Sequence, residues 1–231
     1  MTAVRRSKKN ADRVAAPAPA AALSADVAPV EDNAKRRQIL EGARLVFRAK
    51  GFDGASMEMI ARQANVSKGT LYVYFDSKEA LFEALIHADR HRQAEALMDV
   101  EANRVEDIVA DLQRLGRTYV RLMTSPDKVA MLRMVIGAAE RFPQFGQLLY
   151  EAGPVCGAAR LSRYLESRVA SGDLKPCDTT LAASHFFELC VARLMKRLLF
   201  GVSTTPSEEE IAKTVDLGVD VFLAAYGADR R

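Results

Sequence analysis

The chain has 231 residues, which is enough for one or two domains with a sizeable core. It is 49% apolar and 27% charged, contains no tryptophan and is rich in Ala, Leu and Arg, a composition that favours helix over sheet. The net charge is only +3, but residues 1–80 hold 14 Lys and Arg against 9 Asp and Glu, whereas the remainder holds 19 against 21. A basic N-terminal part indicates DNA binding at one end of the molecule.

The cysteines and the apolar stretches limit where the protein works. Cys156, Cys177 and Cys190 have no C-x-x-C spacing, so we expect a reduced cytoplasmic protein and no disulfide framework or zinc ribbon. A redox-sensing thiol is the alternative, and it requires a lowered pKa. The basic N-terminus is followed by an Ala/Pro run, which argues against a secretory signal. The stretch 181–200 is very apolar but carries four charged side chains, which predicts a buried helix and no membrane span.

The N-terminal segment divides into a tail and a helix. Residues 1–32 are basic and rich in Ala and Pro, with almost no large apolar side chain, which predicts a disordered tail. This tail is either a plain extension, or a misassigned start, or a basic arm that adds phosphate contacts. A helix is expected over 33–50, ended by Gly51, with Phe52 anchored on the small core. Its apolar face consists of Ile39, Ala43, Val46 and Phe47.

Two short helices joined by a tight turn are predicted over 56–75. Ser56 and Ser67 are suited to cap them, since their hydroxyls can accept an unpaired backbone N–H. Asn65 stands where the first helix must end, and asparagine tolerates the left-handed conformation of a sharp exit. Leu71 and Phe75 can face inward together. The second helix suits insertion into a major groove, because its other faces carry donors and a cation on Lys68, Thr70, Tyr72 and Tyr74.

The run from Ile60 to Leu81 reads Ile-Ala-x-x-Ala-x-Val-Ser-x-Gly-Thr-Leu-Tyr-x-Tyr-Phe-x-Ser-Lys-Glu-Ala-Leu. It closely resembles the N-terminal signature of the TetR family of one-component transcriptional regulators, over about residues 37–86. Asn65 replaces the glycine that the family usually has. The resemblance implies a phosphate contact for Lys78 and a position near the DNA backbone for Arg37. The DNA-binding candidates are Arg37, Ser56, Ser67, Lys68, Gly69, Thr70, Tyr72, Tyr74 and Lys78.

A fourth helix is expected from the Asp76–Glu79 cap to about Met98. His87 and His91 lie four residues apart on it, a spacing that can chelate zinc. The metalloprotease motif needs Glu directly after the first histidine, and Ala88 stands there, with no third ligand nearby. We therefore expect no metal and no cofactor.

The rest of the chain reads as helix, with no strand pattern. Pro126 suits the first position of a helix that Ser125 caps. The helix after Pro143 should be irregular around Gly153-Pro154 and end at Gly172. Asp178 and Ser207 suit the caps of the last two helices. With the first four, this gives an all-α protein of about nine helices, the later ones over 105–124, 126–141, 143–171, 178–200 and 207–226.

A second resemblance covers the C-terminal part. The segments Ser125-Pro-Asp, Arg141-Phe-Pro-Gln-Phe and Tyr150-Glu-Ala-Gly-Pro154 are similar to the C-terminal domain of the AefR-like subgroup of the TetR family. This implies an effector-binding and dimerisation domain whose last two helices pack across a two-fold axis. The expected domains are the tail 1–32, the helix-turn-helix domain 33–80 and the C-terminal domain 81–231.

Candidate pocket and interface residues follow from side-chain type. Thioethers and aromatic rings suit an adaptable apolar pocket, and ordinary core is the alternative for each. The pocket candidates are Met123, Met131, Met134, Phe142, Phe145 and Phe186. A helix that is apolar on nearly all sides suits a dimer surface, and Gly218 would permit close helix approach. The interface candidates are Phe187, Val191, Leu194, Leu198, Gly218 and Phe222.

These features favour a ligand-responsive transcriptional repressor. One helix-turn-helix makes too few base contacts for specific binding, so a homodimer on a palindromic operator is expected, released by a small apolar effector. The protein would be cytoplasmic and associated with the nucleoid, without a membrane partner. One alternative is an architectural DNA-binding protein of the same fold without an effector. An enzyme is the other, but the sequence has no phosphate loop, nucleophile elbow or metal-ligand cluster.

Overall fold

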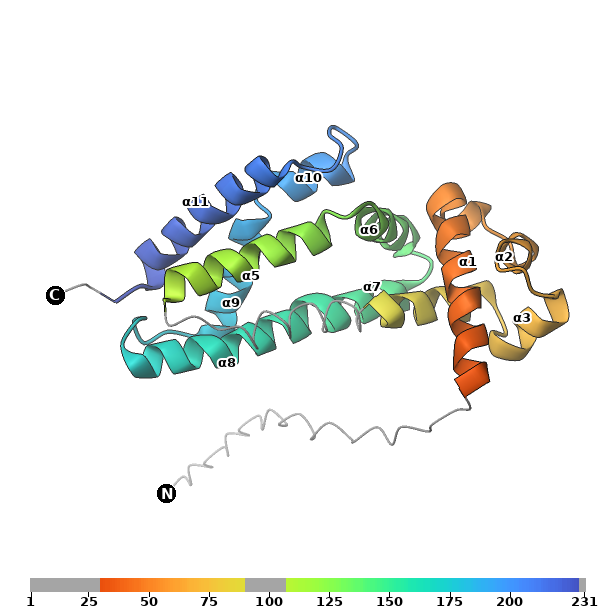
Figure 1. Cartoon of the computed structure of the whole chain (residues 1–231), viewed down its shortest axis with the longest axis horizontal. Coiled ribbons are helices and arrows are strands. Elements are labelled where there is room, and N and C mark those ends of the chain that lie inside the picture. Colours follow the sequence, from red (N-terminus) through yellow and green to blue (C-terminus); the bar gives the residue numbers. More distant parts are fainter. Residues whose placement is uncertain (1–29, 90–106, 229–231) are drawn as a thin grey trace, which may run out of the picture.

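The computed structural model describes residues 30–89 and 107–228. In this part of the chain every regular element is a helix, and the only β-type pairing is an isolated bridge between Leu174 and Gly227. The helices α1, α2 and α3 lie at one end of the molecule, and the helices from α5 onward form the rest of it (Figure 1). The expected all-α fold is therefore confirmed. Three predictions concern residues that the structure does not describe: the tail over 1–29, His91, and the extension of the fourth helix to Met98.

The N-terminal helices follow the expected caps. They are α1 (Val30–Gly54), α2 (Met57–Gln63) and α3 (Lys68–Tyr74), followed by a helix over 78–89. The helical path of α1 breaks at Gly51, where φ is 69°, so the expected stop is confirmed. Asn65 has φ 52°, as a sharp exit from α2 requires. The hydroxyl of Ser77 accepts from the Ala80 amide (3.0 Å) and caps the next helix.

The core of the DNA-binding end is shared with the next domain. Phe52 is in ring contact with four phenylalanines, with centroids 5.2–5.9 Å apart, and three of these four belong to the expected C-terminal part, 81–231. That part contributes α6 (Pro126–Ala138) and α7 (Pro143–Tyr150). The expected boundary at residue 80 therefore does not separate two cores. A DNA-binding unit of about 50 residues buries little apolar surface by itself, so side chains from the next domain complete its core. The other rings of this aromatic cluster are Phe47, Phe82, Phe142 and Phe145.

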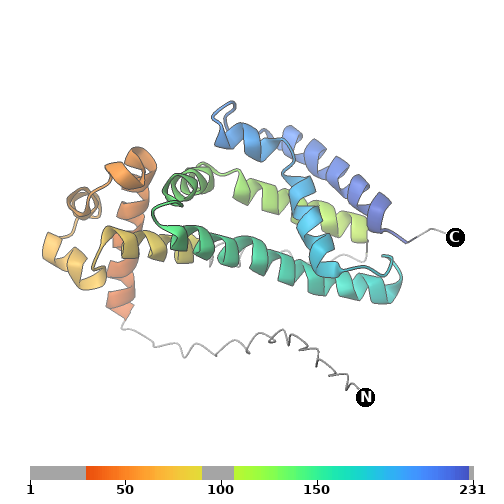
Figure 2. The ribbon, with the colours of Figure 1, turned by 180° about the vertical axis from the view of Figure 1, so that it is seen from behind.

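The C-terminal helices enclose a second core. They are α5 (Ile108–Met123), α8 (Cys156–Ser171), α9 (Thr179–Cys190) and α11 (Glu208–Tyr226). Asp178 caps α9, and Ser207 forms a capping box with Glu210 on α11, both as expected. Seen from behind, α9 lies between α8 and α11 (Figure 2). The core between these helices includes Leu112, Leu165, Phe186, Val215 and Phe222, all fully buried.

Two of the expected long helices are divided. The one over 143–171 contains a π-helical turn, η1 (Glu151–Val155), which holds Pro154, so the expected irregularity is confirmed. The one expected over 178–200 is wrong as a single helix. It ends at Cys190, Arg193 adopts φ 66°, and α10 (Leu194–Leu199) begins in a new direction. In the described ranges, no helix is long and apolar enough to cross a membrane.

Candidate nucleic-acid interface and effector cavity

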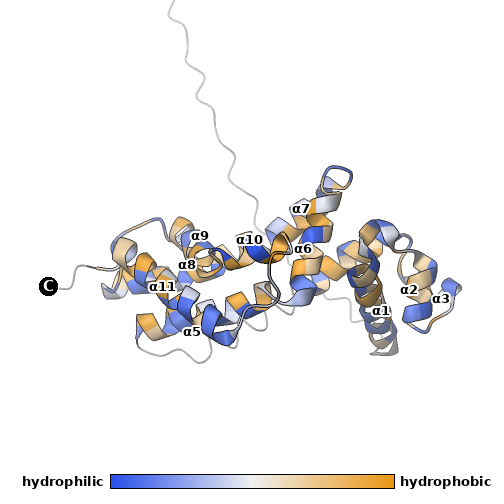
Figure 3. Cartoon of the chain, turned by 90° about the horizontal axis from the view of Figure 1, so that it is seen from above, coloured by the Kyte–Doolittle hydropathy of each residue, from blue (hydrophilic) through white to orange (hydrophobic). Residues whose placement is uncertain are grey.

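The outer face of α3 is exposed at the far end of the molecule, where hydrophilic residues dominate (Figure 3). Leu71 is fully buried and Phe75 is 5% exposed, so the inner face of the helix is fixed on the core as expected. Tyr72 is 42% exposed and Val73 is 82% exposed. Val73 was not among the DNA-binding candidates drawn from the sequence. An exposed aliphatic side chain on this helix suits contact with a thymine methyl group. Because Leu71 and Phe75 define the inner face of the helix, the sequence could have shown that Val73 lies on an outer face.

The ammonium of Lys68 already has a partner. It donates to Glu58 Oε1 of α2 at 2.7 Å. The hydrogen bond with Glu58 raises the pKa of Lys68, and the same bond lowers the pKa of Glu58. Both side chains are more than half exposed, and an exposed pair contributes little to stability. Lys68 can therefore exchange Glu58 for a base or a phosphate at small cost.

The small polar residues around α3 mainly shape the backbone. The Ser56 hydroxyl accepts from the Met59 amide (3.2 Å), and the Ser67 hydroxyl accepts from the Thr70 amide (3.0 Å). The Thr70 and Ser67 hydroxyls are also 2.8 Å apart, so they share a hydrogen bond. A Cβ at Gly69 would approach nothing closer than 3.8 Å. Packing inside the protein therefore does not require glycine at this position.

Lys78 supports the loop between α1 and α2. Its ammonium donates to the carbonyl oxygens of Phe52 (2.8 Å) and Ala55 (3.1 Å) and lies 4.6 Å from the Phe52 ring centroid. An ammonium has three donors, so one remains for a phosphate. The phosphate contact that the family resemblance implies stays a prediction, beside a structural role that the sequence did not show.

Replacement of Lys78 by methionine tests both roles. The loss of two charge-assisted hydrogen bonds is expected to lower the free energy of unfolding by about 1.5–3 kcal/mol, measured by urea denaturation. If the third donor also binds a phosphate, the slope of log affinity for DNA against log salt falls by about 1. A variant that is destabilised but keeps the full salt slope would limit Lys78 to supporting the loop.

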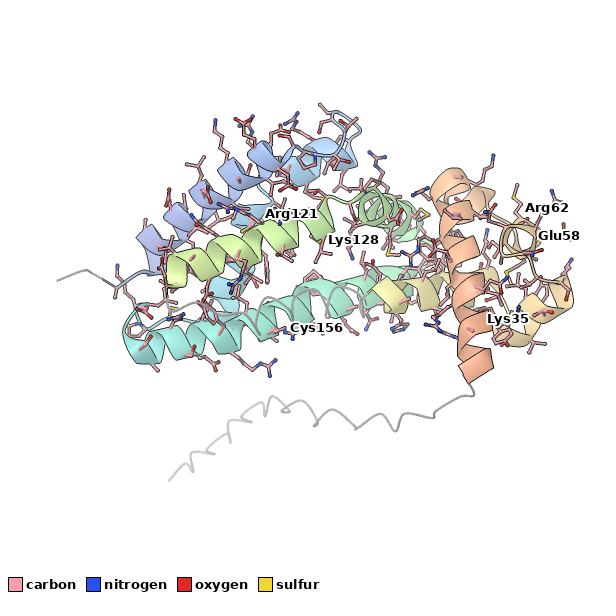
Figure 4. The ribbon with its side chains drawn as sticks, viewed as in Figure 1. Lys35, Glu58, Arg62, Arg121, Lys128 and Cys156 are labelled. Atoms are coloured by element: carbon pink, nitrogen blue, oxygen red, sulfur yellow. The ribbon has the colours of Figure 1, made fainter. Side chains whose placement is uncertain are left out.

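The two remaining candidates of the DNA-binding end differ in exposure. Arg37 is exposed on α1. Tyr74 is half-buried against the N-terminal core, so its ring belongs partly to the inner face of α3. Further charged side chains that border the helix-turn-helix are Lys35, Glu58 and Arg62 (Figure 4).

A cavity of about 450 Å³ lies in the C-terminal part. Its wall includes aromatic rings, aliphatic side chains, three glycines and two charged residues. The Tyr119 and Phe187 rings are in contact, with centroids 4.4 Å apart. Of the six pocket candidates, only Met123 lines this cavity. The lining residues are Tyr119, Leu122, Met123, Lys128, Leu132, Gly146, Leu149, Tyr150, Gly153, Pro154, Gly157, Ser184, Phe187 and Glu188.

The other five pocket candidates are core residues, which corrects the expectation. Met131 and Phe145 are buried in the N-terminal core, and Met134 and Phe142 pack against it. Phe186 is fully buried in the C-terminal core. Side-chain type did not separate cavity from core, because the actual wall is built largely from glycines, leucines and tyrosines that converge from six elements of the fold.

The six dimer-interface candidates are also buried within one protomer, at 8% exposure or less for every side chain. Phe187 lines the cavity. A Cβ at Gly218 would lie 3.3 Å from the carbonyl of Leu189, so the close approach joins α11 to α9 of the same chain. This corrects the expected surface: Val191, Leu194, Leu198 and Phe222 likewise face inward.

The cysteines differ in environment. Cys190 is buried in the core, and burial raises the pKa of its thiol to about 12. Burial also raises the pKa of the Cys177 thiol, while Cys156 is exposed on α8. A raised pKa disfavours the reactive thiolate, so neither Cys177 nor Cys190 has the environment of a redox sensor. Among the described residues, no three His, Cys, Asp or Glu side chains gather as metal ligands.

Comparison with known proteins finds transcriptional repressors among the relatives of this chain. The HTH-type transcriptional repressor Rv1474c of Mycobacterium tuberculosis is 41% identical over 189 residues, which cover 80% of this chain and 90% of that protein. The repressor AcnR of Corynebacterium diphtheriae is 29% identical over 126 residues, which cover 54% of this chain and 65% of that protein.

Solved structures of transcriptional regulators have a fold similar to that of this chain. A putative TetR-family regulator from Mesorhizobium loti superposes with a TM-score of 0.81 at 30% identity, covering 87% of this chain and all of that chain. The flavonoid-responsive regulator FrrA superposes with a TM-score of 0.68 at 32% identity, covering 86% and 100%.

Family descriptions match both parts of the chain. Residues 39–85 match the bacterial regulatory proteins of the tetR family, and residues 110–228 match the C-terminal domain of AefR-like transcriptional repressors. The second match alone covers more than half of the sequence. The chain therefore belongs to the TetR family of bacterial transcriptional regulators and has a C-terminal domain of the AefR-like repressor type.

Proposed function

We propose that this protein is a repressor that binds a palindromic operator as a homodimer and is released by a small molecule. The observation that carries the proposal is the construction of α3. Its inner face is fixed on the core through Leu71, while Lys68, Tyr72 and Val73 project outward from a helix whose N-terminus is capped by Ser67. A short, rigidly held helix with exposed polar and apolar side chains suits reading of base edges in the major groove.

The homodimer would use the outer faces of α9 and α11. Leu181 of α9 and both Leu217 and Val221 of α11 are 51–57% exposed, and the two helices pack against each other. Exposed aliphatic side chains on neighbouring helices indicate an interaction surface. Two helix-turn-helix units are also needed to distinguish an operator from the many competing sites of a genome.

Charge placed on this surface is expected to prevent dimerisation. The change Leu217→Glu/Val221→Glu should give a monomer by light scattering and weaken operator binding by at least tenfold, because a charged side chain in an apolar interface has no partner. Val202→Glu is the matched control, since Val202 is 71% exposed but lies between α10 and α11. A double variant that remains dimeric would place the interface elsewhere.

The effector would occupy the 450 Å³ cavity, which falls in the range of about 300–1,000 Å³ typical of small-molecule sites. The relative FrrA is named as flavonoid-responsive, which supports a small-molecule effector for this fold. Two helices of the cavity wall, α6 and α7, also contribute to the hydrophobic core that holds the DNA-binding end. A ligand that favours another arrangement of these helices would change operator affinity by its coupling free energy.

The proposal is tested by fluorescence anisotropy of the full chain on DNA duplexes tiled across the region upstream of its gene. Non-specific duplex serves as competitor, at two salt concentrations. We expect one tile that contains an inverted repeat to resist the competitor. Equal binding to every tile, lost at the higher salt concentration, would favour the architectural alternative.

A further inference from the structure

The wall of the cavity contains a buried cation. Lys128 lies in the first turn of α6 and is only 5% exposed. Its ammonium donates to Asp89 Oδ2 at 2.6 Å, and the Asp89 side chain is 14% exposed. Figure 4 shows Lys128 on the side of α6 that faces the helix over 78–89. One side chain therefore contacts both the cavity and the helix that follows the DNA-binding unit.

This ion pair is poorly explained by stability alone. Removal of two charges from water costs several kcal/mol, and a buried pair often contributes no net stability. The pair does connect parts of the molecule that regulation would have to couple. Asp89 belongs to the helix over 78–89, whose Leu81, Phe82 and Leu85 are buried in the core of the DNA-binding end.

A second donor faces the same cavity. Burial raises the pKa of the Tyr119 phenol far above its usual range, so the phenol stays neutral and keeps its proton. Its hydroxyl makes no hydrogen bond to another of the described residues, although the side chain lines the cavity. The Tyr119 hydroxyl is therefore available to donate a hydrogen bond to an oxygen acceptor on a ligand in the cavity.

The charges on the wall favour an anion over a cation. Glu188 also lines the cavity, but its side chain is exposed, so water and salt screen its charge. The Lys128 ammonium is buried, and its charge acts through a medium of lower dielectric constant. Asp89 neutralises this charge in the pair, so an anionic group that takes the place of Asp89 at Lys128 would gain more than a cationic group near Glu188.

We propose that the cavity binds an amphipathic weak acid, whose carboxylate takes Lys128 from Asp89. This inference rests on the proposed function, in which the same cavity is the effector site. One carboxylate replaces another at the same ammonium, and the released Asp89 carboxylate has to be hydrated, from a side chain that is 14% exposed in the pair. The ligand's apolar body then decides the outcome by burial against side chains such as Leu122, Met123 and Leu132. The Lys128–Asp89 bond between α6 and the helix over 78–89 is then lost, and operator affinity falls.

The test compares three ligands that share one alkyl chain. Binding of decanoate, decanol and decyltrimethylammonium to the full-length protein is measured by calorimetry without DNA. We expect decanoate to bind at least tenfold more tightly than decanol, since a hydrogen bond to a charged group is stronger than one between neutral groups. Tighter binding of decyltrimethylammonium would overturn the proposal in favour of Glu188. Equal binding of all three, or binding of none, would also overturn it.

Variants of the ion pair separate its two roles. Lys128→Met should abolish the preference for decanoate, whereas Lys128→Arg should retain it. Asp89→Asn should tighten decanoate binding about tenfold and weaken operator binding without ligand, because Lys128 loses its internal partner. Decanoate affinity that is unchanged in Lys128→Met, in a variant with the wild-type circular dichroism spectrum, would refute the proposal.

A matched control lies one residue away. Asp127 pairs with Arg48 of α1 (2.9 Å) and does not line the cavity, so Asp127→Asn should leave decanoate affinity unchanged. Operator binding by the wild type without ligand is measured separately. If that binding is specific but decanoate has no preference, the repressor stands and only the ligand class is wrong.

Discussion

Replacement of Phe52 by alanine is expected to lower the free energy of unfolding by about 3–5 kcal/mol, the usual cost of deleting a buried phenylalanine ring. Phe52 is 5% exposed and contacts the rings of four other phenylalanines, one from before the expected domain boundary at residue 80 and three from after it. Its ring also lies beneath the Lys78 ammonium. The loss should appear in urea denaturation as a lower midpoint.

The control for this change is Phe200→Ala, because Phe200 is 78% exposed and should alter stability by less than about 0.5 kcal/mol. The two halves should also unfold together in the wild type, since they share one aromatic cluster. A Phe52→Ala loss below about 1 kcal/mol would mean that the cluster does not join the DNA-binding end to α6 and α7.

The change with the largest expected effect on function is Lys68→Ala/Tyr72→Ala. Both side chains project from α3, and each base contact contributes about 1–3 kcal/mol of discrimination, so specific operator affinity should fall by about 10²-fold. Neither residue is part of the core, so thermal stability should stay close to that of the wild type. Anisotropy titration on the operator duplex gives the affinity.

Lys213→Ala serves as the control, since Lys213 is an exposed cation on α11, far from α3 (Figure 1). Its affinity for the operator should match the wild type. Retention of full operator affinity by the double variant would mean that α3 is not the recognition helix.

The sequence was most informative where a signal is local. The caps at Ser56, Ser67, Ser125 and Ser207 each depend on a hydroxyl within three residues of the amide that it accepts from, and all four form. The left-handed Asn65 likewise depends on one residue. The bounds and the cap of α3 could therefore be predicted, together with the outward position of Lys68 and Tyr72.

Features that depend on packing between distant segments could not be predicted. The break between α9 and α10 occurs at Arg193, and neither glycine nor proline marks it. Side chains of an apolar helix gave no indication of which face meets the same chain, so interface candidates such as Phe222 proved to be core. The Lys128–Asp89 pair joins residues 39 positions apart, and the spacing of residues along a sequence carries no signal for it.

The central claim is that two copies of α3 read the operator in successive major grooves. The most direct test is methylation interference with dimethyl sulfate on the operator duplex, because guanine N7 lies in the major groove. We predict interference at guanines in two symmetric half-sites, with centres about 10 base pairs apart or a multiple of that spacing. Interference confined to adenine N3 in the minor groove, or to a single half-site, would contradict the account.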